Sequence, residues 1–314
     1  MNKFPFEEIE RDILVKRKAE AEVQATPLPL KDLVSYGIVN IDKPPGPTSH
    51  QTAEFVKKIL GLKKAGHSGT LDPQVTGVLA VAIGKATRIT QALLPAGKEY
   101  VAVMYLHKEV DEKDIRAAFK ALTGKIMQMP PVKSAVRRIE RPRSVYYIDI
   151  MEIDKQHVLF KIGCEAGTYI RKYIHDLGKK LGCGAHMVEL RRTKVATFDE
   201  STCYTLQDLA DAFHYYKENN EKFLKEIIQP IETGVKHLPK VWVLNSTKKP
   251  LTHGRDLAIP GIVKLESEIK KDDLVAILDQ NNLLISLGTA IMTSEEIMKQ
   301  EKGIAVKNEK VFIH

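Results

Sequence analysis

The chain has 314 residues, 43% of them hydrophobic and 28% charged, which predicts a folded protein of roughly two domains and excludes an intrinsically disordered one. No apolar run approaches the ~18 residues of a membrane-spanning helix, and residues 1–17 lack the apolar core of a signal peptide, so we expect a cytoplasmic protein that contacts no membrane. The net charge of +8 favours a polyanionic partner, and residues 237–314 contribute little to it, with 11 basic and 10 acidic residues.

Hydrophobic periodicity predicts alternating helices and strands up to residue 228. The helices are expected over residues 7–23, from a Thr48 or Ser49 cap to Gly61, and over 114–122, 170–181 and 205–228. The strands are expected over residues 37–41, 101–106, 146–153 and 157–164. Because residues 101–106 are apolar on both faces, we expect that strand to be largely buried.

A second domain is predicted to begin at His237-Leu238-Pro239. Short β segments follow, separated by glycine and proline as in a small barrel, over residues 241–244, 273–278, 283–288 and 310–313. The resulting division is an N-terminal extension (1–36), a central domain (37–236) and a C-terminal domain (237–314).

Asp72 stands out as a candidate functional residue. It lies in the run Gly66-His67-Ser68-Gly69-Thr70-Leu71-Asp72-Pro73, just before an apolar stretch. Glycine and proline indicate a tight turn that displays the carboxylate. Such an aspartate can be a nucleophile, a general base or a metal ligand, and it can equally be a turn cap.

The three cysteines, Cys164, Cys183 and Cys203, are too few and too scattered for a disulfide framework. Cys183 and His186 lie near His175, but no Cys-x-x-Cys pair exists. Buried or bystander thiols are therefore favoured over a zinc site, and we expect no metal.

Five motifs together resemble one family. They are Gly37–Ser49, His67–Leu79, Lys98-Glu99-Tyr100, Ala166–Arg171 and Leu190–Thr193. In this order and spacing they resemble the TruB-type pseudouridine synthases, most closely the archaeal relatives of dyskerin, which act with box H/ACA guide RNAs. The resemblance runs from about residue 30 to the C-terminus. It implies a mixed α/β (α+β) catalytic domain with a mostly antiparallel sheet and a central cleft. A C-terminal PUA β-barrel should follow, with the N-terminal extension a candidate for packing against it.

The resemblance implies the roles of the site residues. Asp72 is the catalytic carboxylate, and Arg171 holds it ionised and oriented by charge-assisted hydrogen bonds. Tyr100 stacks on a flipped-out uracil, and its hydroxyl takes part in proton transfer at C5. The remaining members are Tyr169 and Leu190 as walls, Lys43 as a support of the aspartate loop, and His67 as an RNA contact.

Two segments are candidates for binding RNA. Four arginines within seven positions suit either a solvated charge run or a phosphate-gripping loop: Arg137, Arg138, Arg141 and Arg143. The resemblance implies that residues 130–143 form the family's RNA-clamping thumb loop, although Glu140 and Pro142 interrupt the basic run. A second candidate basic patch comprises Arg191, Arg192 and Lys194.

In the C-terminal domain, residues 252–262 resemble the RNA-binding signature of a PUA domain. There glycines let the main chain approach RNA, whose single-stranded bases can be read by hydrogen bonds. The guide-RNA contacts expected are Thr252, His253, Gly254, Arg255 and Gly261.

The function that these features predict is isomerisation of uridine to pseudouridine in ribosomal RNA, and also in transfer RNA, directed by a box H/ACA guide. The isomerisation adds and removes nothing overall, so no cofactor is expected. The expected partners are guide and substrate RNA, Nop-type and Gar-type small proteins, and a kink-turn-binding ribosomal-type protein. Two alternatives stay open: a stand-alone synthase for the T-loop of transfer RNA, and a non-catalytic RNA-binding scaffold.

Overall fold

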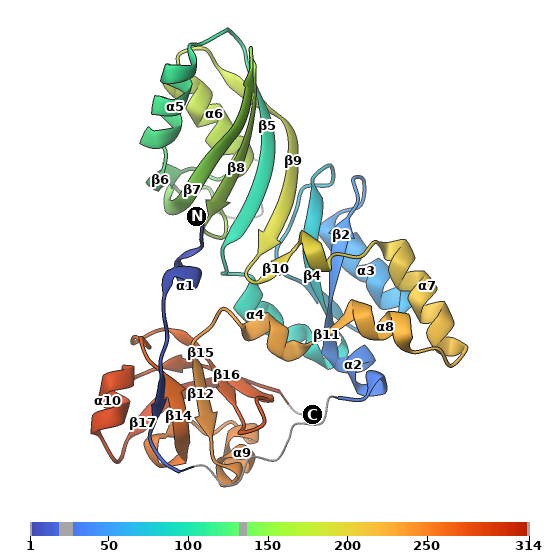
Figure 1. The fold of residues 1–314 in the computed structure, drawn as a ribbon, viewed down its shortest axis with the longest axis vertical. Coiled ribbons are helices and arrows are strands. Elements are labelled where there is room, and N and C mark those ends of the chain that lie inside the picture. The colour runs from blue at the N-terminus through green and yellow to red at the C-terminus, as the bar shows by residue number, and fades with distance from the viewer. Residues whose placement is uncertain (1, 19–27, 132–136, 313–314) are drawn as a thin grey trace.

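The computed structural model describes residues 2–18, 28–131 and 137–312 of the chain. Two β-sheets organise these residues: a ten-stranded sheet flanked by helices, and a seven-stranded sheet that forms the lower end of the molecule in Figure 1. The N-terminal segment runs along both, since α1 (Pro5–Glu8) lies beside the larger sheet and β1 (Ile13–Val15) belongs to the smaller one (Figure 1).

The ten-stranded sheet has the order β11-β2-β4-β9-β5-β8-β7-β6, with β3 beside β4 and β10 beside β9. Its strands are β2 (Gly37–Lys43), β3 (Ala65–His67), β4 (Thr76–Ile83), β5 (Lys98–Leu106), β6 (Gly124–Gln128), β7 (Arg141–Asp154), β8 (His157–Cys164), β9 (Ala185–Val195), β10 (Phe198–Asp199) and β11 (Ile228–Pro230). Every neighbouring pair is antiparallel except β4 with β9. The predicted mixed α/β class with a mostly antiparallel sheet is thus confirmed.

The helices of this part are α2 (Leu30–Tyr36), α3 (Ser49–Ile59), α4 (Thr90–Leu93), α5 (Glu112–Ala121), α6 (Ile170–Lys180), α7 (Leu206–Lys217) and α8 (Lys222–Ile227). Thr48 caps α3 as predicted, because its side chain accepts a hydrogen bond from the main-chain N–H of Gln51. Helices α5 and α6 pack on the half of the sheet that contains β5 and β8, and the apolar cluster between them includes Phe119, Phe160 and Tyr173.

The two halves of the large sheet meet at a narrow junction. Strands β4 and β9 pair in parallel over only two positions, Thr76 with Arg191 and Gly77 with Arg192. Gly77 has φ +102°, and a Cβ atom there would lie 2.1 Å from the carbonyl oxygen of Arg192, so only glycine fits this approach. The loop that carries Asp72 leads directly into this junction, since it precedes β4.

The smaller sheet has the order β1-β14-β12-β15-β16-β17-β13. Its C-terminal elements are β12 (Lys240–Val243), α9 (Asn245–Thr252), β13 (Leu257–Ala258), β14 (Ile262–Glu266), β15 (Leu274–Leu278), β16 (Leu284–Ala290), α10 (Ser294–Lys299) and β17 (Ile304–Val311). The four predicted β segments of this region correspond to β12, β15, β16 and the end of β17, although Ile313 lies outside the described residues.

Two predicted helices are wrong. Instead of a helix over residues 7–23, the chain forms α1 and β1, and residues 19–23 lie outside the described part. The cause is long-range, because Ile13–Val15 pair with β14 and Leu14 packs into the apolar core of the small sheet. The predicted helix over 205–228 is broken between α7 and α8, where Asn219 adopts a left-handed φ of 66°.

A shared apolar core joins the two sheets. One cluster contains Ile38, Leu93 and Val195 from the larger sheet and its helices, together with Trp242 and Leu284 from the smaller one. The C-terminal part therefore does not pack as a separate body, and removing residues 237–314 would expose this cluster to water.

His237 lies within this junction and makes it sensitive to acid. Burial lowers the pKa of His237 to about 4, and its Nε2–H donates to the carbonyl of Ala92 over 3.1 Å. The ordinary histidine pKa is about 6.5, so the unfolded chain binds a proton first as the pH falls, and stability is lost between these two values.

We expect the free energy of unfolding to fall by up to roughly 3 kcal/mol between about pH 6.5 and pH 4 because of this one group. The measurement is denaturant unfolding across this range for the wild type and for His237→Gln, which keeps a donor for Ala92 and does not titrate. Identical pH dependence of the two proteins would contradict the assignment.

Candidate active site

Asp72 and Arg171 form an ion pair at the surface of the large sheet. Arg171 is the second residue of α6, and Asp72 lies in the loop between β3 and β4. The side chains are 57% and 52% exposed for Arg171 and Asp72, so a ligand can reach both. The structure thus brings together two predicted site residues that are 99 positions apart in the sequence.

The loop that carries Asp72 is braced from below by Lys43. This lysine is fully buried, and its ammonium donates three hydrogen bonds of 2.9 Å, to the carbonyls of Pro44, Pro73 and Val75. Burial, followed by the nearby Arg192 charge, lowers the pKa of Lys43. Two of the three carbonyls, those of Pro73 and Val75, follow Asp72 closely in the chain, so Lys43 contacts the loop that carries this aspartate.

A second brace of this loop was not predicted. Ser49, considered from sequence only as a helix cap, accepts a hydrogen bond of 2.7 Å from the main-chain N–H of Leu71 and is fully buried. The residue stands in the Pro-Thr-Ser turn, and nothing in the local sequence distinguishes a cap from a contact with a loop 22 positions away.

Tyr100 and Leu190 lie on adjacent strands of the sheet, β5 and β9, and each is 9% exposed. Both belong to the apolar cluster that contains Leu71, next to Asp72. Tyr169 stands at the N-cap position of α6, two residues before Arg171, and its main chain exchanges two hydrogen bonds with the buried side-chain amide of Gln128. Gln128 is a positioning contact that the sequence did not reveal.

His67 is the last residue of β3, at the start of the loop that carries Asp72. Burial lowers its pKa, with Arg192 and His50 adding to the effect, so the imidazole is neutral at pH 7. Its Nδ1 accepts a hydrogen bond of 3.3 Å from the main-chain N–H of Gly69. That places the ring proton on Nε2, where it can donate to a ligand.

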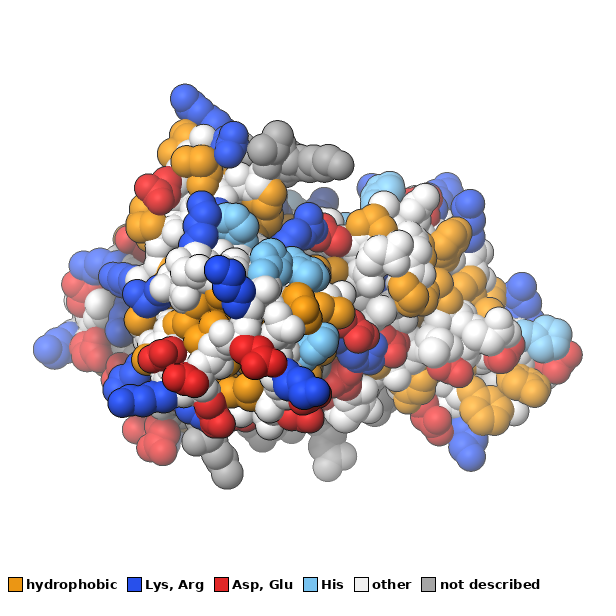
Figure 2. Space-filling model, turned by 90° about the horizontal axis from the view of Figure 1, so that it is seen from above, with side chains coloured by type: hydrophobic (Ala, Val, Ile, Leu, Met, Phe, Trp, Pro, Cys, Tyr) orange, Lys and Arg blue, Asp and Glu red, His pale blue; other side chains and the backbone are white. Residues whose placement is uncertain are grey.

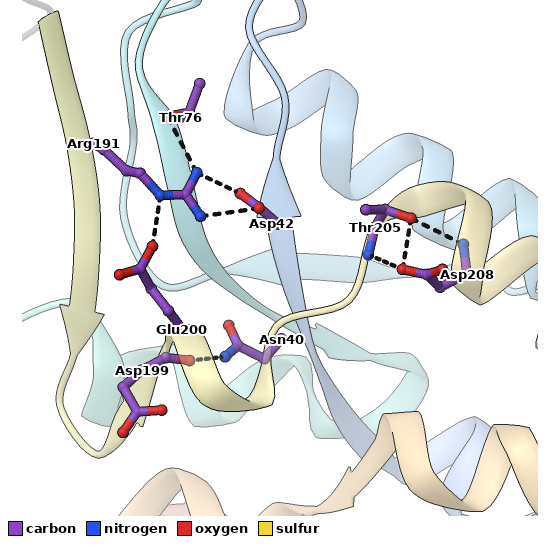
Figure 3. Close-up of polar contacts among 8 residues, drawn as sticks. All are labelled: Asn40, Asp42, Thr76, Arg191, Asp199, Glu200, Thr205 and Asp208. Atoms are coloured by element: carbon purple, nitrogen blue, oxygen red, sulfur yellow. Dashed lines mark hydrogen bonds and ion pairs between the residues drawn. The ribbon is translucent and has the colours of Figure 1, made fainter.

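The second predicted basic patch is wrong, because Arg191 and Lys194 are paired with acidic side chains and Arg192 is buried. Arg191 makes a bidentate pair with Asp42, with two contacts of 3.0 Å, and a contact of 2.6 Å with Glu200 (Figure 3). Lys194 pairs with Glu7. Arg192 is 1% exposed and points into the protein, where its Nε donates to the carbonyl of Val78 over 2.7 Å.

The predicted thumb loop is described only in part. Residues 132–136 lie outside the described residues, and Arg137 and Arg138 are exposed. Arg141 begins β7 and is half-buried, whereas Arg143 lies 3.7 Å from the carboxylate of Glu165. Within the described residues, Arg143 is the one of these four arginines that pairs with a carboxylate.

The predicted PUA signature surrounds the end of α9. Thr252 is the last residue of this helix and is half-buried, while His253, Gly254 and Arg255 are exposed in the following turn. Gly254 has φ +83° and open space around its Cα. The fifth residue, Gly261, instead packs against Thr247, where a Cβ would approach Oγ1 to 2.7 Å.

A basic groove lies between the large sheet and the end of β17. It encloses a cavity of about 470 Å³, lined by four exposed basic side chains: Lys63, Lys64, Lys85 and Arg88. Arg88 donates to the carbonyl of Val311 over 3.0 Å, and none of the four has an acidic partner within the described residues. At one end of the groove, Lys63 and Lys64 lie just before β3, which ends at His67. At the other end the groove reaches β17, and β17 pairs with β13, the strand that follows Arg255.

Histidines gather on the face seen from above, where basic and acidic side chains are interspersed (Figure 2). The Nδ1 atom of His186 lies 3.0 Å from the Nε2 atom of His107.

In residues 2–18, 28–131 and 137–312, no three His, Cys, Asp or Glu side chains group as metal ligands. Within the same ranges, no helix is long and apolar enough to cross a membrane.

The sheet, the aspartate–arginine pair and the C-terminal β domain define the class of protein. Family models match in succession: a DKCLD (NUC011) domain over residues 4–53, the TruB family pseudouridylate synthase N-terminal domain over 57–170, the tRNA pseudouridylate synthase B C-terminal domain over 171–236, and a PUA domain over 239–312. The chain belongs to the TruB family of pseudouridylate synthases, which confirms the predicted family and the PUA domain.

Its relatives make the assignment more specific. The chain is 52% identical to a probable tRNA pseudouridine synthase B of Pyrococcus horikoshii and 53% identical to that of Thermococcus onnurineus, in each case over 98% of this chain and 94% of the relative. A solved structure of a Cbf5-Nop10-Gar1 complex contains a chain that is 50% identical with a TM-score of 0.93, covering 99% of this chain and 97% of that one. A structure of an H/ACA RNP bound to a substrate RNA containing 2'-deoxyuridine matches at 48% identity and a TM-score of 0.90, covering 99% and 98%.

Proposed function

We propose that this chain converts specific uridines to pseudouridine in RNA chosen by a box H/ACA guide, with Asp72 as the catalytic carboxylate. The observation that carries the proposal is the Asp72–Arg171 pair, which is exposed to ligand while the loop that carries Asp72 is held by hydrogen bonds from Lys43. Preorganised groups of this kind are what catalysis requires, since they need no rearrangement when charge develops.

The reaction is an isomerisation whose atoms balance within the nucleotide. The bond between C1′ and N1 breaks, the uracil turns, and a bond forms between C1′ and C5. The proton on C5 is lost and one is gained at N1. The step open to Asp72 is attack on C1′, attack on C6 or removal of a proton from C2′. The target must leave its stack to reach the carboxylate, and Tyr100, Tyr169 and Leu190 offer a flat apolar site for the flipped base.

The guide is proposed to lie along three features of this surface. These are the exposed turn at His253–Arg255, the basic groove of Lys63, Lys64, Lys85 and Arg88, and the aspartate loop that follows β3. Phosphates supply the anionic charge that the three lysines and the one arginine of the groove do not find among the described residues. Base pairing then supplies the sequence specificity.

By similarity to the solved complexes, we propose that the chain assembles with Nop-type and Gar-type small proteins and with guide and substrate RNA. A kink-turn-binding ribosomal-type protein is proposed to join through the RNA. Since the relatives are named probable tRNA pseudouridine synthase B, guide-free modification of transfer RNA is the second candidate function.

The deciding experiment compares these two functions directly. A ribosomal RNA fragment and a transfer RNA are incubated with the full chain, with and without a matched guide and the partner proteins, and pseudouridine is counted. We expect a clear rise on the ribosomal fragment only when guide and partners are added. Full activity on that fragment without a guide would favour a stand-alone synthase. If neither RNA contained pseudouridine, a non-catalytic RNA-binding scaffold would be favoured instead.

The RNA path predicts which surface charges matter. Arg255→Ala and Lys85→Ala should each weaken guide-RNA binding several-fold and lower the slope of log K against log salt by about one. Lys120→Ala on α5, at the opposite end of the molecule, is the matched control and should change neither (Figure 1). Affinity is measured on the full chain, because the shared apolar core makes deletion of residues 237–314 an unsound test. An effect of Lys120→Ala equal to that of Lys85→Ala would show that charge alone, and not this path, binds the guide.

A further inference from the structure

Arg192 is a buried cation that the proposed mechanism does not yet use. It is 1% exposed and has no carboxylate partner in the part of the chain that the structure describes. Its guanidinium is held by two main-chain carbonyls, Val78 over 2.7 Å from Nε and Gly69 over 3.1 Å from a terminal nitrogen. Burying an arginine without a counter-charge costs several kcal/mol, so its retention needs a reason.

The two carbonyls connect separate parts of the site. Val78 belongs to β4, and Gly69 lies in the loop three residues before Asp72. The main chain of Arg192 is in register with Gly77 on one side and with Tyr100 on the other. Arg192 therefore occupies the narrow junction of the sheet, between the aspartate loop and the tyrosine that faces the base.

Arg192 and Tyr100 lie opposite each other on the paired antiparallel strands β9 and β5, so their side chains project from the same face, with the Tyr100 hydroxyl next to the guanidinium. A guanidinium has five donors and no acceptor, so the tyrosine oxygen must accept in this contact. The O–H is then directed away from Arg192. Burial raises the pKa of Tyr100, and the charge of Arg192 opposes that rise.

A purely structural role fits Arg192 less well than it fits its neighbour. Arg191 already ties β9 to β2 through Asp42, with full charge compensation at the surface (Figure 3). At a fully buried position, an apolar side chain of similar volume fills space without the desolvation cost. An apolar residue would lose the two carbonyl contacts as well as the one with Tyr100, and of these only the last reaches a side chain proposed to face the base.

We propose that Arg192 is a positioning residue for the isomerisation: it fixes the Tyr100 ring against the aspartate loop and turns the tyrosine O–H toward the nucleotide. The inference rests on the proposed function of the site. Its distinctive consequence is that Arg192 acts on the rate through the Tyr100 hydroxyl, so removing that hydroxyl should make Arg192 almost irrelevant to the rate.

A double-mutant cycle tests this coupling. Single-turnover pseudouridine formation is measured for Arg192→Lys, Tyr100→Phe and the double variant in the full assembly, with Arg191→Lys as the matched control. We expect Arg192→Lys to slow the reaction at least tenfold, Arg191→Lys less than threefold, and the double variant to match Tyr100→Phe within twofold. If the rate loss of the double variant equalled the product of the two single losses, or if Arg192→Lys reacted at the normal rate, the proposal would be overturned.

A second measurement does not depend on activity or on a folded Arg192 variant. 3-Fluorotyrosine is placed at position 100 or, separately, at position 173, and each is titrated by ¹⁹F NMR in the otherwise wild-type chain. Tyr173 is also buried, 1% exposed against 9% for Tyr100, but its hydroxyl has no partner within the described residues, and burial raises its pKa. We expect the label at Tyr100 to titrate at the lower pH. An equal or higher value at Tyr100 would refute the guanidinium contact, whereas absent pseudouridine with the expected titration would count against the proposed function alone.

Discussion

Asp72→Asn is expected to abolish pseudouridine formation while leaving the fold and RNA binding intact. The substitution keeps the shape of the side chain and removes its charge and nucleophilicity, and we expect a loss of at least about a thousandfold, or about 4 kcal/mol of barrier. Stability should change little, because more than half of the Asp72 and Arg171 side chains is exposed, and exposed ion pairs contribute about 0–1 kcal/mol.

The measurement is single-turnover formation of pseudouridine in the guided assembly, together with thermal unfolding and guide-RNA affinity. Asp42→Asn is the matched control, because it also removes an aspartate from an arginine pair, but from the pair with Arg191 (Figure 3). We expect this control to retain activity within a few-fold. Near-normal turnover by Asp72→Asn would reject the proposed mechanism.

Arg171→Lys should be the next most damaging change. Lysine keeps the positive charge but loses the planar fork that can orient a carboxylate through two parallel hydrogen bonds. The expected loss is at least about tenfold in rate, equivalent to about 1.4 kcal/mol. Because Asp72 would be misdirected rather than removed, the loss should appear in the chemical step and not in RNA affinity.

The control for this variant is Arg116→Lys on α5, where the arginine pairs with Glu112 four residues earlier on an exposed helix surface. The free energy of unfolding of both variants should lie within about 0.5 kcal/mol of the wild-type value, since exposed ion pairs contribute little to stability. If Arg171→Lys turned over at the wild-type rate, the fork would have no role and a simple positive charge would suffice.

Much of the architecture could be predicted from local sequence. The Thr48 cap needs only a hydroxyl before free amides, and the helices of residues 114–122 and 170–181 need only their apolar stripes, so the prediction and the structure agree there. The expected burial of the strand over 101–106 holds for one face, since Ala102, Met104 and Leu106 are buried and the alternate residues are half-buried. Residues 101–106 are apolar on both faces of the strand, and this sequence pattern could not show that helices cover only one of the two faces.

The N-terminal segment shows where local reasoning fails. Glu7–Val23 has the composition of a short helix, yet Ile13–Val15 form a strand because β14 offers a hydrogen-bonding edge. That edge is about 250 positions away in the chain, with Ile13 opposite Glu266. No window of the sequence contains both partners.

The motifs sufficed to identify the family and to nominate Asp72, Arg171 and Tyr100, since they recur as short strings of residues. Packing alone decided what their neighbours do. Three basic residues of β9 look alike in sequence, but Arg191 meets Asp42, Lys194 meets Glu7, and Arg192 enters the core to reach Val78, 114 positions away. Strand geometry sends alternate side chains to opposite faces, and what lies on each face is set by segments distant in sequence. A basic side chain therefore becomes a surface charge or a buried support only when those segments come together.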